Sequence, residues 1–178
     1  MHEGRRQHLL KLAREAIASQ LGVSASPPVP PFDPNGEPAP PTFVTLTKAG
    51  KLRGCVGHTD PSGTLEETVA ACAVAAATAD PRFPPLRPGE LPRVRIEISL
   101  LTPPIPIADP ADIAAGTHGV IVSRGSRRAL LLPQVASEHH WTADTLLSQA
   151  CLKAGLPEDA WRHGAHIEVF TAEVFAEA

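Results

Sequence analysis

Long apolar runs are missing from this chain of 178 residues. No run approaches the roughly 18 consecutive apolar residues of a membrane-spanning helix, and the N-terminal residues lack the continuous apolar region of a signal peptide. Cysteine is scarce, and the three cysteines contain no CxxC pair, which argues against a disulfide framework. We therefore expect a cytoplasmic protein without a membrane segment.

An excess of charge of one sign is missing as well. The formal net charge is -3 and the pI is about 6.2, so nothing draws the whole chain to nucleic acid or to an anionic membrane. No pair among the eight histidines has the spacing of a known metal site, and His139-His140 and His163–His166 are interpreted as surface groups. No GxGxxG or P-loop pattern lies at a predicted strand–helix turn. We expect neither a metal nor an organic cofactor.

What the sequence does contain is typical of a globular protein, with 43% hydrophobic and 20% charged residues. The length suits one well-buried domain, residues 1–178, with at most a small appendage. Eight of the 20 prolines lie within residues 23–41. That stretch is interpreted as an extended segment that crosses the surface, and a ligand for an SH3-type domain is the alternative.

Periodicity predicts a mixture of helices and strands. A capping box at Thr64–Glu67 opens a helix of small residues, which runs to about Ala79 and would lie unusually close to a sheet. Cys72 and Cys151 fall on the buried stripes of their helices and are interpreted as core residues. Further helices are expected at 5–21, 110–115, 133–138 and 142–154, and strands at 42–48, 51–57, 93–101, 119–124, 127–132 and 166–175.

The most informative segment is Leu52-Arg-Gly-Cys-Val-Gly57, which puts a charge, a thiol and two glycines into a predicted strand. A strand that serves only packing carries β-branched or aromatic residues at such positions. Glycine inside a strand often marks the close approach of a ligand or of another backbone. The segment therefore locates a candidate site, with Gly54 as one of its substrate-binding residues.

A two-residue turn at Ala49-Gly50 would set the register of the hairpin that contains this segment. It predicts three directly opposed pairs: Leu46 with Arg53, Val44 with Cys55, and Phe43 with Val56. Arg53 and Cys55 would then project together on the face of Val44 and Leu46. Because both faces carry apolar residues, we expect this hairpin to lie in the centre of a sheet.

The thiol of Cys55 is the candidate reactive group. It would act as a nucleophile only as a thiolate, which needs a nearby cation or base. Arg53 would supply the cation, and His58 would act as the base if the chain turns back after Gly57. The alternative is a buried, inert cysteine, which is the commoner state of a free thiol.

Arg53 needs a partner, because an unpaired buried guanidinium costs on the order of 3–5 kcal/mol. The structural interpretation pairs Arg53 with Glu97, a charged residue in another predicted core strand. The functional interpretation opens Arg53 to a cleft, where it would hold a carboxylate or phosphate bidentately. Arg82, which lies among prolines, would supply a second cation or would only cap the end of a helix.

Seven segments, in this order, resemble the AMMECR family, also called AmmeMemoRadiSam system protein A. They are Thr42-Phe-Val-Thr-Leu46, Leu52-Arg-Gly-Cys-Val-Gly57, Asp80-Pro-Arg-Phe-Pro-Pro-Leu86, Ile96-Glu-Ile-Ser-Leu-Leu-Thr-Pro103, His118-Gly119, Leu132-Pro-Gln-Val135 and Lys153-Ala-Gly-Leu156 with Trp161. The resemblance covers about residues 5–175. It implies a compact α+β fold, with an antiparallel-rich sheet, packed helices and a smaller lobe.

The resemblance also implies that Leu52–Cys55 is a hallmark segment of suspected function, but it brings no settled activity. Family members are similar to proteins encoded beside a Memo-like protein and a radical S-adenosylmethionine enzyme. The resemblance therefore suggests these two proteins as partners.

Two hypotheses of function follow. The first is a small cytoplasmic enzyme or enzyme component with a cleft at Arg53–His58, in which Cys55 reacts, Arg53 and Arg82 bind a small anion, and His58 or Glu97 handles protons. The second is a non-catalytic adaptor, in which the same residues form a polar core and the outer face docks one of the two partners. Preferential labelling of Cys55 among the three cysteines would favour the enzyme.

Overall fold

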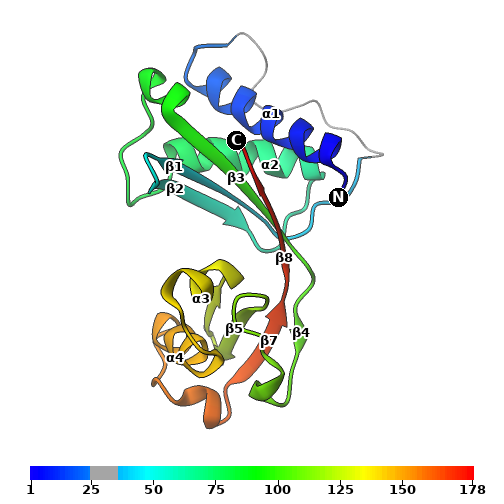
Figure 1. The fold of residues 1–178 in the computed structure, drawn as a ribbon, viewed down its shortest axis with the longest axis vertical. Coiled ribbons are helices and arrows are strands. Elements are labelled where there is room, and N and C mark those ends of the chain that lie inside the picture. The colour runs from blue at the N-terminus through cyan, green and yellow to red at the C-terminus, as the bar shows by residue number, and fades with distance from the viewer. Residues whose placement is uncertain (25–35) are drawn as a thin grey trace. The chain divides into compact units, whose positions relative to one another are not determined.

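The computed structural model describes residues 1–24 and 36–178, which form two compact units (Figure 1). The first unit comprises Met1–Leu100 with Glu173–Ala178, and the second comprises Leu101–Ala172. Each unit has its own hydrophobic core, and the described strands form two four-stranded sheets. The predicted α+β class is confirmed. The expectation of an extended proline-rich segment falls largely on residues 25–35, which lie outside the described residues.

The first unit is a sheet in the order β2-β1-β3-β8, with two helices on one of its faces (Figure 1). Strand β1 is antiparallel to β2 and to β3. The elements are α1 Glu3–Gln20, β1 Thr42–Lys48, β2 Lys51–His58, α2 Leu65–Thr78, the 3₁₀ helix η1 Pro88–Arg93, β3 Val94–Leu101 and β8 Ala172–Ala176.

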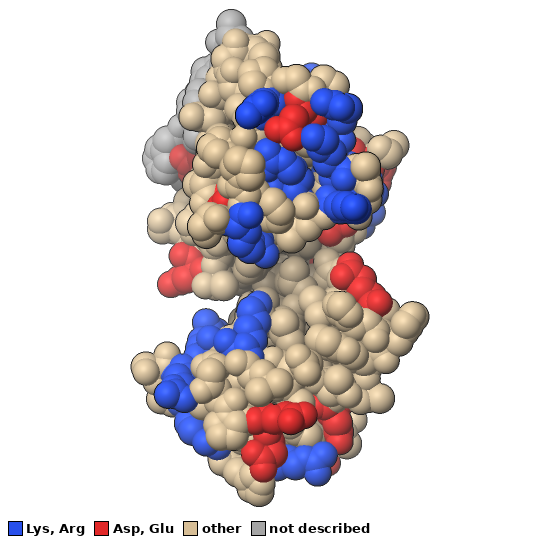
Figure 2. Space-filling model, turned by 90° about the vertical axis from the view of Figure 1, so that its left-hand side faces the viewer, with Lys and Arg blue, Asp and Glu red and all other residues tan. Residues whose placement is uncertain are grey.

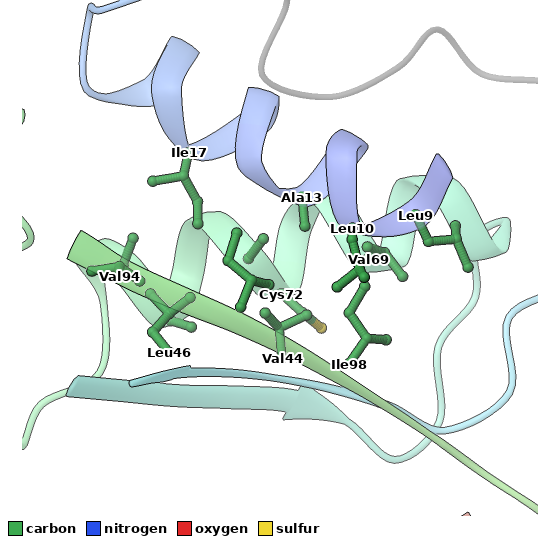
Figure 3. Packing of buried hydrophobic residues seen from close by; sticks show 14 of the residues in the cluster. Leu9, Leu10, Ala13, Ile17, Val44, Leu46, Val69, Cys72, Val94 and Ile98 are labelled. Carbon is green, nitrogen blue, oxygen red and sulfur yellow. The ribbon is translucent and has the colours of Figure 1, made fainter. Parts of the chain in front are cut away.

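The core of the first unit lies between the helices and the sheet (Figure 3). Fully buried side chains from α1, such as Leu9 and Ile17, meet those of β1, such as Val44 and Leu46. The predicted capping box starts α2: Thr64 accepts from the Glu67 backbone N–H, and Glu67 accepts from the Thr64 N–H. Most of the remaining residues of α2 are small, which lets this helix pack close to the strands beneath it.

The β1–β2 hairpin confirms the predicted turn and corrects the predicted register. Ala49 and Gly50 both have positive φ, 51° and 74°, as the tight hairpin turn requires. Beyond the turn, Arg53 is an extra residue in a β-bulge, so each later partner lies one residue further along β2. The observed pairs are Leu46–Gly54, Thr45–Cys55, Val44–Val56 and Phe43–Gly57.

This shift changes the face on which the thiol lies. Cys55 is opposite Thr45, so it points away from the helices, while Val44 and Leu46 are buried beneath them. The expectation of a central hairpin is also wrong, because β2 is an edge strand and Leu52 is exposed. One bulge therefore moves the candidate site from the core face to the outer face.

The second unit is an antiparallel sheet in the order β4-β7-β5-β6, with the core built mainly against α4. Its elements are β4 Ile105–Pro106, the 3₁₀ helix η2 Pro110–Asp112, β5 Gly119–Arg124, β6 Arg127–Leu131, α3 Pro133–His139, α4 Ala143–Lys153, the 3₁₀ helix η3 Ala160–Arg162 and β7 His166–Phe170.

The predicted strand at 166–175 is in fact two strands. The strand is interrupted at Thr171. There the backbone N–H of Thr171 donates to the Thr102 hydroxyl, and the Thr171 carbonyl accepts from the Thr102 N–H. Strand β7 then belongs to the sheet of the second unit and β8 to the sheet of the first. An apolar alternation does not reveal this change of partner, because both strands carry the same period of two.

Candidate functional site

Strand β2 is an edge strand, and the Asp80–Arg82 segment covers part of its free edge. The Cys55 N–H donates to the Asp80 carboxylate at 2.9 Å, and the Arg82 guanidinium donates to the Cys55 carbonyl at 3.4 Å. The two backbone groups of Cys55 that a further strand would pair with are thus satisfied by side chains. The backbone of Cys55 is held from a segment 25 residues further along the chain.

Asp80 and Arg82 form a bidentate ion pair, with Nε–Oδ1 at 3.0 Å and Nη2–Oδ2 at 2.7 Å. Asp80 is 5% exposed, and the hydrogen bond from Arg82 is the main reason that its pKa lies well below the ordinary value. The pKa of Arg82 is raised, chiefly by the hydrogen bond to Asp80, and a thiolate at Cys55 would add to the effect. Arg82 is therefore engaged with Asp80 and lies beside Cys55.

The three cysteines occupy different environments. Cys55 is partly exposed, and its sulfur accepts a hydrogen bond from the Thr45 hydroxyl at 3.3 Å. Cys72 and Cys151 are fully buried, as predicted, and burial raises the pKa of both thiols, that of Cys72 to about 11. Among the three, Cys55 has the solvent access and the polar neighbours that thiol chemistry needs.

Arg53 has Glu90 as its charged partner. Its Nε and Nη2 donate to the two oxygens of Glu90 at 3.3 and 3.1 Å, and Nη2 also reaches the Pro85 carbonyl at 3.5 Å. The charged partner of Arg53 is therefore Glu90 of η1 and not the predicted Glu97. Arg53 is the extra residue of the bulge, so its side chain no longer follows the predicted register. Glu97 itself is half-buried on β3, opposite Thr45.

Glu90 accepts from more groups than Arg53. The Lys48 ammonium donates to Oε1 at 2.6 Å and the Arg87 backbone N–H to Oε2 at 3.0 Å. The hydrogen bonds from Arg53 are the largest cause of the low pKa of Glu90, followed by that from Lys48. The carboxylate consequently stays charged well into the acidic range.

These groups line an open cavity of about 540 Å³, which we name the basic hollow. Its lining residues are Lys48, Arg53, Pro84, Pro85, Arg87, Gly89, Glu90 and Arg93. Figure 2 shows this face of the first unit, where blue side chains surround a red centre. Of the residues Arg53–His58, where a cleft is predicted, only Arg53 lines this hollow, so a cleft that opens onto Cys55 stays a prediction.

Two different groups lie close to Gly54 and Gly57, a helix carbonyl and an aromatic ring. A Cβ at Gly54 would lie 2.0 Å from the Ala76 carbonyl oxygen, so this glycine lets α2 pack directly on β2. A Cβ at Gly57 would lie 2.3 Å from the ring of Phe43, which covers the glycine across the hairpin. The group that approaches Gly54 is thus a helix backbone, and binding of a substrate at Gly54 stays a prediction.

The structure does not bring His58 to Cys55. His58 is exposed at the end of β2, opposite Thr42, and residues three apart in a strand point to opposite faces. Glu97 shares a row with Cys55, but Thr45 lies between them. Two strand spacings put the Cα atoms of Cys55 and Glu97 roughly 10 Å apart, so direct proton transfer between them would need a relay.

Sequence reasoning missed Asp80, Glu90, Thr45 and Lys48. In the Asp80–Leu86 segment the arginine between prolines is the conspicuous residue, and nothing in the periodicity of the chain marks Glu90 as the partner of a distant arginine. An aspartate directly after a helix end, before Pro-Arg, was the available signal for a turn that holds a buried carboxylate.

Within residues 1–24 and 36–178, no cluster of three or more His, Cys, Asp or Glu side chains is placed to bind a metal ion. None of the described helices combines the length and hydropathy that a bilayer crossing requires.

The chain is similar throughout to proteins whose activity is not named. The family model described as AMMECR1 matches residues 10–175. Protein Mbar_A1807 of Methanosarcina barkeri is 42% identical over 94% of this chain and 88% of its own length, and Protein MK0488 of Methanopyrus kandleri is 43% identical over 96% and 87%. The crystal structure of Uncharacterized Protein PH0010 from Pyrococcus horikoshii superposes with a TM-score of 0.89, at 35% identity, over 99% of this chain and 93% of that one.

Proposed function

The chain belongs to the AMMECR1 family, and we propose that it is a small enzyme, or a component of one, that uses the Cys55 thiol on an anionic substrate. The observation that carries this proposal is the difference between Cys55 and the two buried cysteines. Cys55 alone of the three has access to solvent, a hydroxyl donor at its sulfur and a guanidinium beside it.

Each neighbour of Cys55 has a distinct part in this proposal. The Thr45 hydroxyl donates a hydrogen bond to the Cys55 sulfur and orients it. Asp80 fixes the backbone of Cys55 and orients Arg82, so it is a positioning residue. Arg53 binds the anionic part of the substrate in the basic hollow. Proton transfer by His58 or Glu97 stays a prediction.

Alkylation by iodoacetamide at neutral pH, followed site by site by mass spectrometry, tests the reactivity of Cys55. We expect Cys55 to react in the native protein, and Cys72 and Cys151 to react only after denaturation. Arg82→Gln should slow the alkylation of Cys55 roughly two- to fivefold, because the thiolate loses a nearby partly exposed cation. Arg128→Gln, an exposed arginine of the second unit, is the matched control and should leave the rate unchanged.

A native protein in which all three thiols resist alkylation would remove the chemical part of this proposal. An alkylation rate of Cys55 that is unchanged in both Arg82→Gln and Thr45→Val would also contradict the chemical part of the proposal. Either result would leave the adaptor hypothesis, in which the partners are a Memo-like protein and a radical S-adenosylmethionine enzyme.

A further inference from the structure

We propose that the basic hollow is a binding site for a small molecule that carries at least two phosphate charges. The hollow combines four cationic side chains with one carboxylate, a formal net charge of +3 in a space of about 540 Å³. This volume is within the range of sites for metabolite-sized ligands, roughly 300–1,000 Å³. The inference rests on the proposed function for the anionic character of the substrate, but it does not need Cys55 to react.

The carboxylate of Glu90 cannot accept further hydrogen bonds from the side chains of Arg87 and Arg93. Oε1 accepts from Lys48 and from Nε of Arg53, and Oε2 accepts from Nη2 of Arg53 and from the Arg87 backbone. A carboxylate offers about four such positions. The charges of Lys48 and Arg53 are thus shared with Glu90, and their side chains are held in fixed positions.

The positive charges of Arg87 and Arg93 are not neutralised by any carboxylate among the described residues. Both residues are exposed, and neither forms an ion pair within residues 1–24 and 36–178. Arg93 is held by a hydrogen bond from Nη2 to the Gly89 carbonyl at 3.4 Å. Two guanidinium groups on the wall of one cavity, neither neutralised by a described carboxylate, suit the oxygens of a phosphate, which arginine binds bidentately.

The charge of the hollow favours phosphate over a single carboxylate. A phosphate monoester carries about -1.5 to -2 charges near neutral pH, so a molecule with two phosphate charges or more matches the excess of +3 better than one carboxylate does. Pro84, Pro85 and Gly89 line the same cavity without side-chain donors. They offer an apolar surface for the uncharged part of the ligand.

A long nucleic acid fits the molecule less well than a small ligand. The hollow holds four of the 16 lysines and arginines with one carboxylate, while the chain as a whole has a formal net charge of -3, so the rest of the chain is net negative. An extended phosphate backbone would also meet the acidic remainder of the surface. The proposed occupant is therefore a small phosphorylated compound.

Isothermal titration of the full chain with inorganic pyrophosphate, at constant ionic strength, tests this site. We expect saturable binding, and a dissociation constant at least about tenfold larger for the double variant Arg87→Gln/Arg93→Gln, which loses two charged hydrogen-bond donors. Arg128→Gln is the control and should bind as the wild type does. Without ligand, the double variant should melt close to the wild type, because the lost hydrogen bond from Arg93 to the Gly89 carbonyl is exposed and the variant also loses like-charge repulsion.

Three outcomes would overturn the inference. They are no binding of pyrophosphate at millimolar concentration, equal binding by the double variant, and tighter binding of succinate or of a 20-nucleotide single strand than of pyrophosphate. Cys55→Ser should bind pyrophosphate as the wild type does, since the thiol does not line the hollow. Lost pyrophosphate binding with intact Cys55 alkylation would refute this site alone, and the reverse result would refute the thiol proposal alone.

Discussion

At the scale of single residues, Asp80 connects the fold to the candidate site. Its carboxylate is almost fully buried and accepts from the Cys55 N–H and from the Arg82 side chain and backbone. A buried carboxylate is stable only when such donors surround it. The residue that holds the thiol in place is therefore also one whose loss should be felt in stability.

Asp80→Ala should lower the free energy of unfolding by about 2–3 kcal/mol, because it leaves the Cys55 N–H without an acceptor and removes charged hydrogen bonds. Urea denaturation measures this change. The matched control is Asp144→Ala, which removes an exposed ion pair with Arg162. The side chain of Asp144 is 64% exposed and that of Arg162 is 57% exposed. The control should change the stability by less than about 1 kcal/mol, and an equal effect of the two variants would contradict the role given to Asp80.

At the scale of elements, the candidate site depends on one segment, residues 80–90, that runs along the edge strand β2. Its first residues bind the backbone of Cys55, and its last ones hold Arg53 through the Pro85 carbonyl and Glu90. Prolines at 81, 84, 85 and 88 restrict the backbone of this segment. The thiol and the basic hollow are thus supported from the same strand and by the same rigid segment.

Helix α2 packs against the core-facing side of β2, opposite to the side on which Cys55 lies, and Gly54 is the point of contact. Gly54→Ala should destabilise the first unit by about 1–3 kcal/mol, because its methyl group would overlap the Ala76 carbonyl oxygen and force the helix away. Thermal unfolding followed by circular dichroism measures the loss. Gly89→Ala is the control, since nothing lies within 4 Å of its added Cβ. Equal melting temperatures for wild type and Gly54→Ala would show that the helix yields without cost.

At the scale of the whole molecule, the low pKa values of Asp80, Glu90 and Glu173 tie the stability of the first unit to pH. A carboxylate whose pKa is lower in the folded than in the unfolded state stabilises the fold at higher pH, and the contribution is lost as pH falls. The ordinary values of these groups lie near 4. The stabilisation should be complete above about pH 5 and decline progressively below pH 4.

Glu90→Gln should therefore be less stable than the wild type by about 2–3 kcal/mol at pH 7, because the charged hydrogen bonds of Arg53 and Lys48 are lost. The difference should shrink as the pH is lowered from 5 to 3, where the wild-type carboxylate begins to lose its advantage. Urea denaturation at stepped pH values measures both curves. Glu15→Gln, at an exposed position of α1, should follow the wild type at every pH, and parallel curves for Glu90→Gln would contradict the prediction.

The sequence by itself determined most of the elements, although not the division of residues 166–175 into two strands. Capping, periodicity and turn residues are local signals, so α2 with its Thr64 capping box, the Ala49-Gly50 turn and the burial of Cys72 and Cys151 were all predictable. The family was predictable too, because its motifs are contiguous. The need of Arg53 for a charged partner was predictable as well, since a charge inside a strand has to be either paired or used, but the identity of that partner was not.

Only the tertiary structure decided which groups meet. The bulge at Arg53 shifted the hairpin register by one residue and moved Cys55 to the outer face, and an energy balance between packing and pairing, rather than a local pattern, sets such a bulge. Asp80 reaches Cys55 across 25 residues and Glu90 reaches Arg53 across 37. Those contacts exist because the edge of β2 has unpaired backbone groups and a half-buried guanidinium that need partners, and the segment that folds against that edge supplies them.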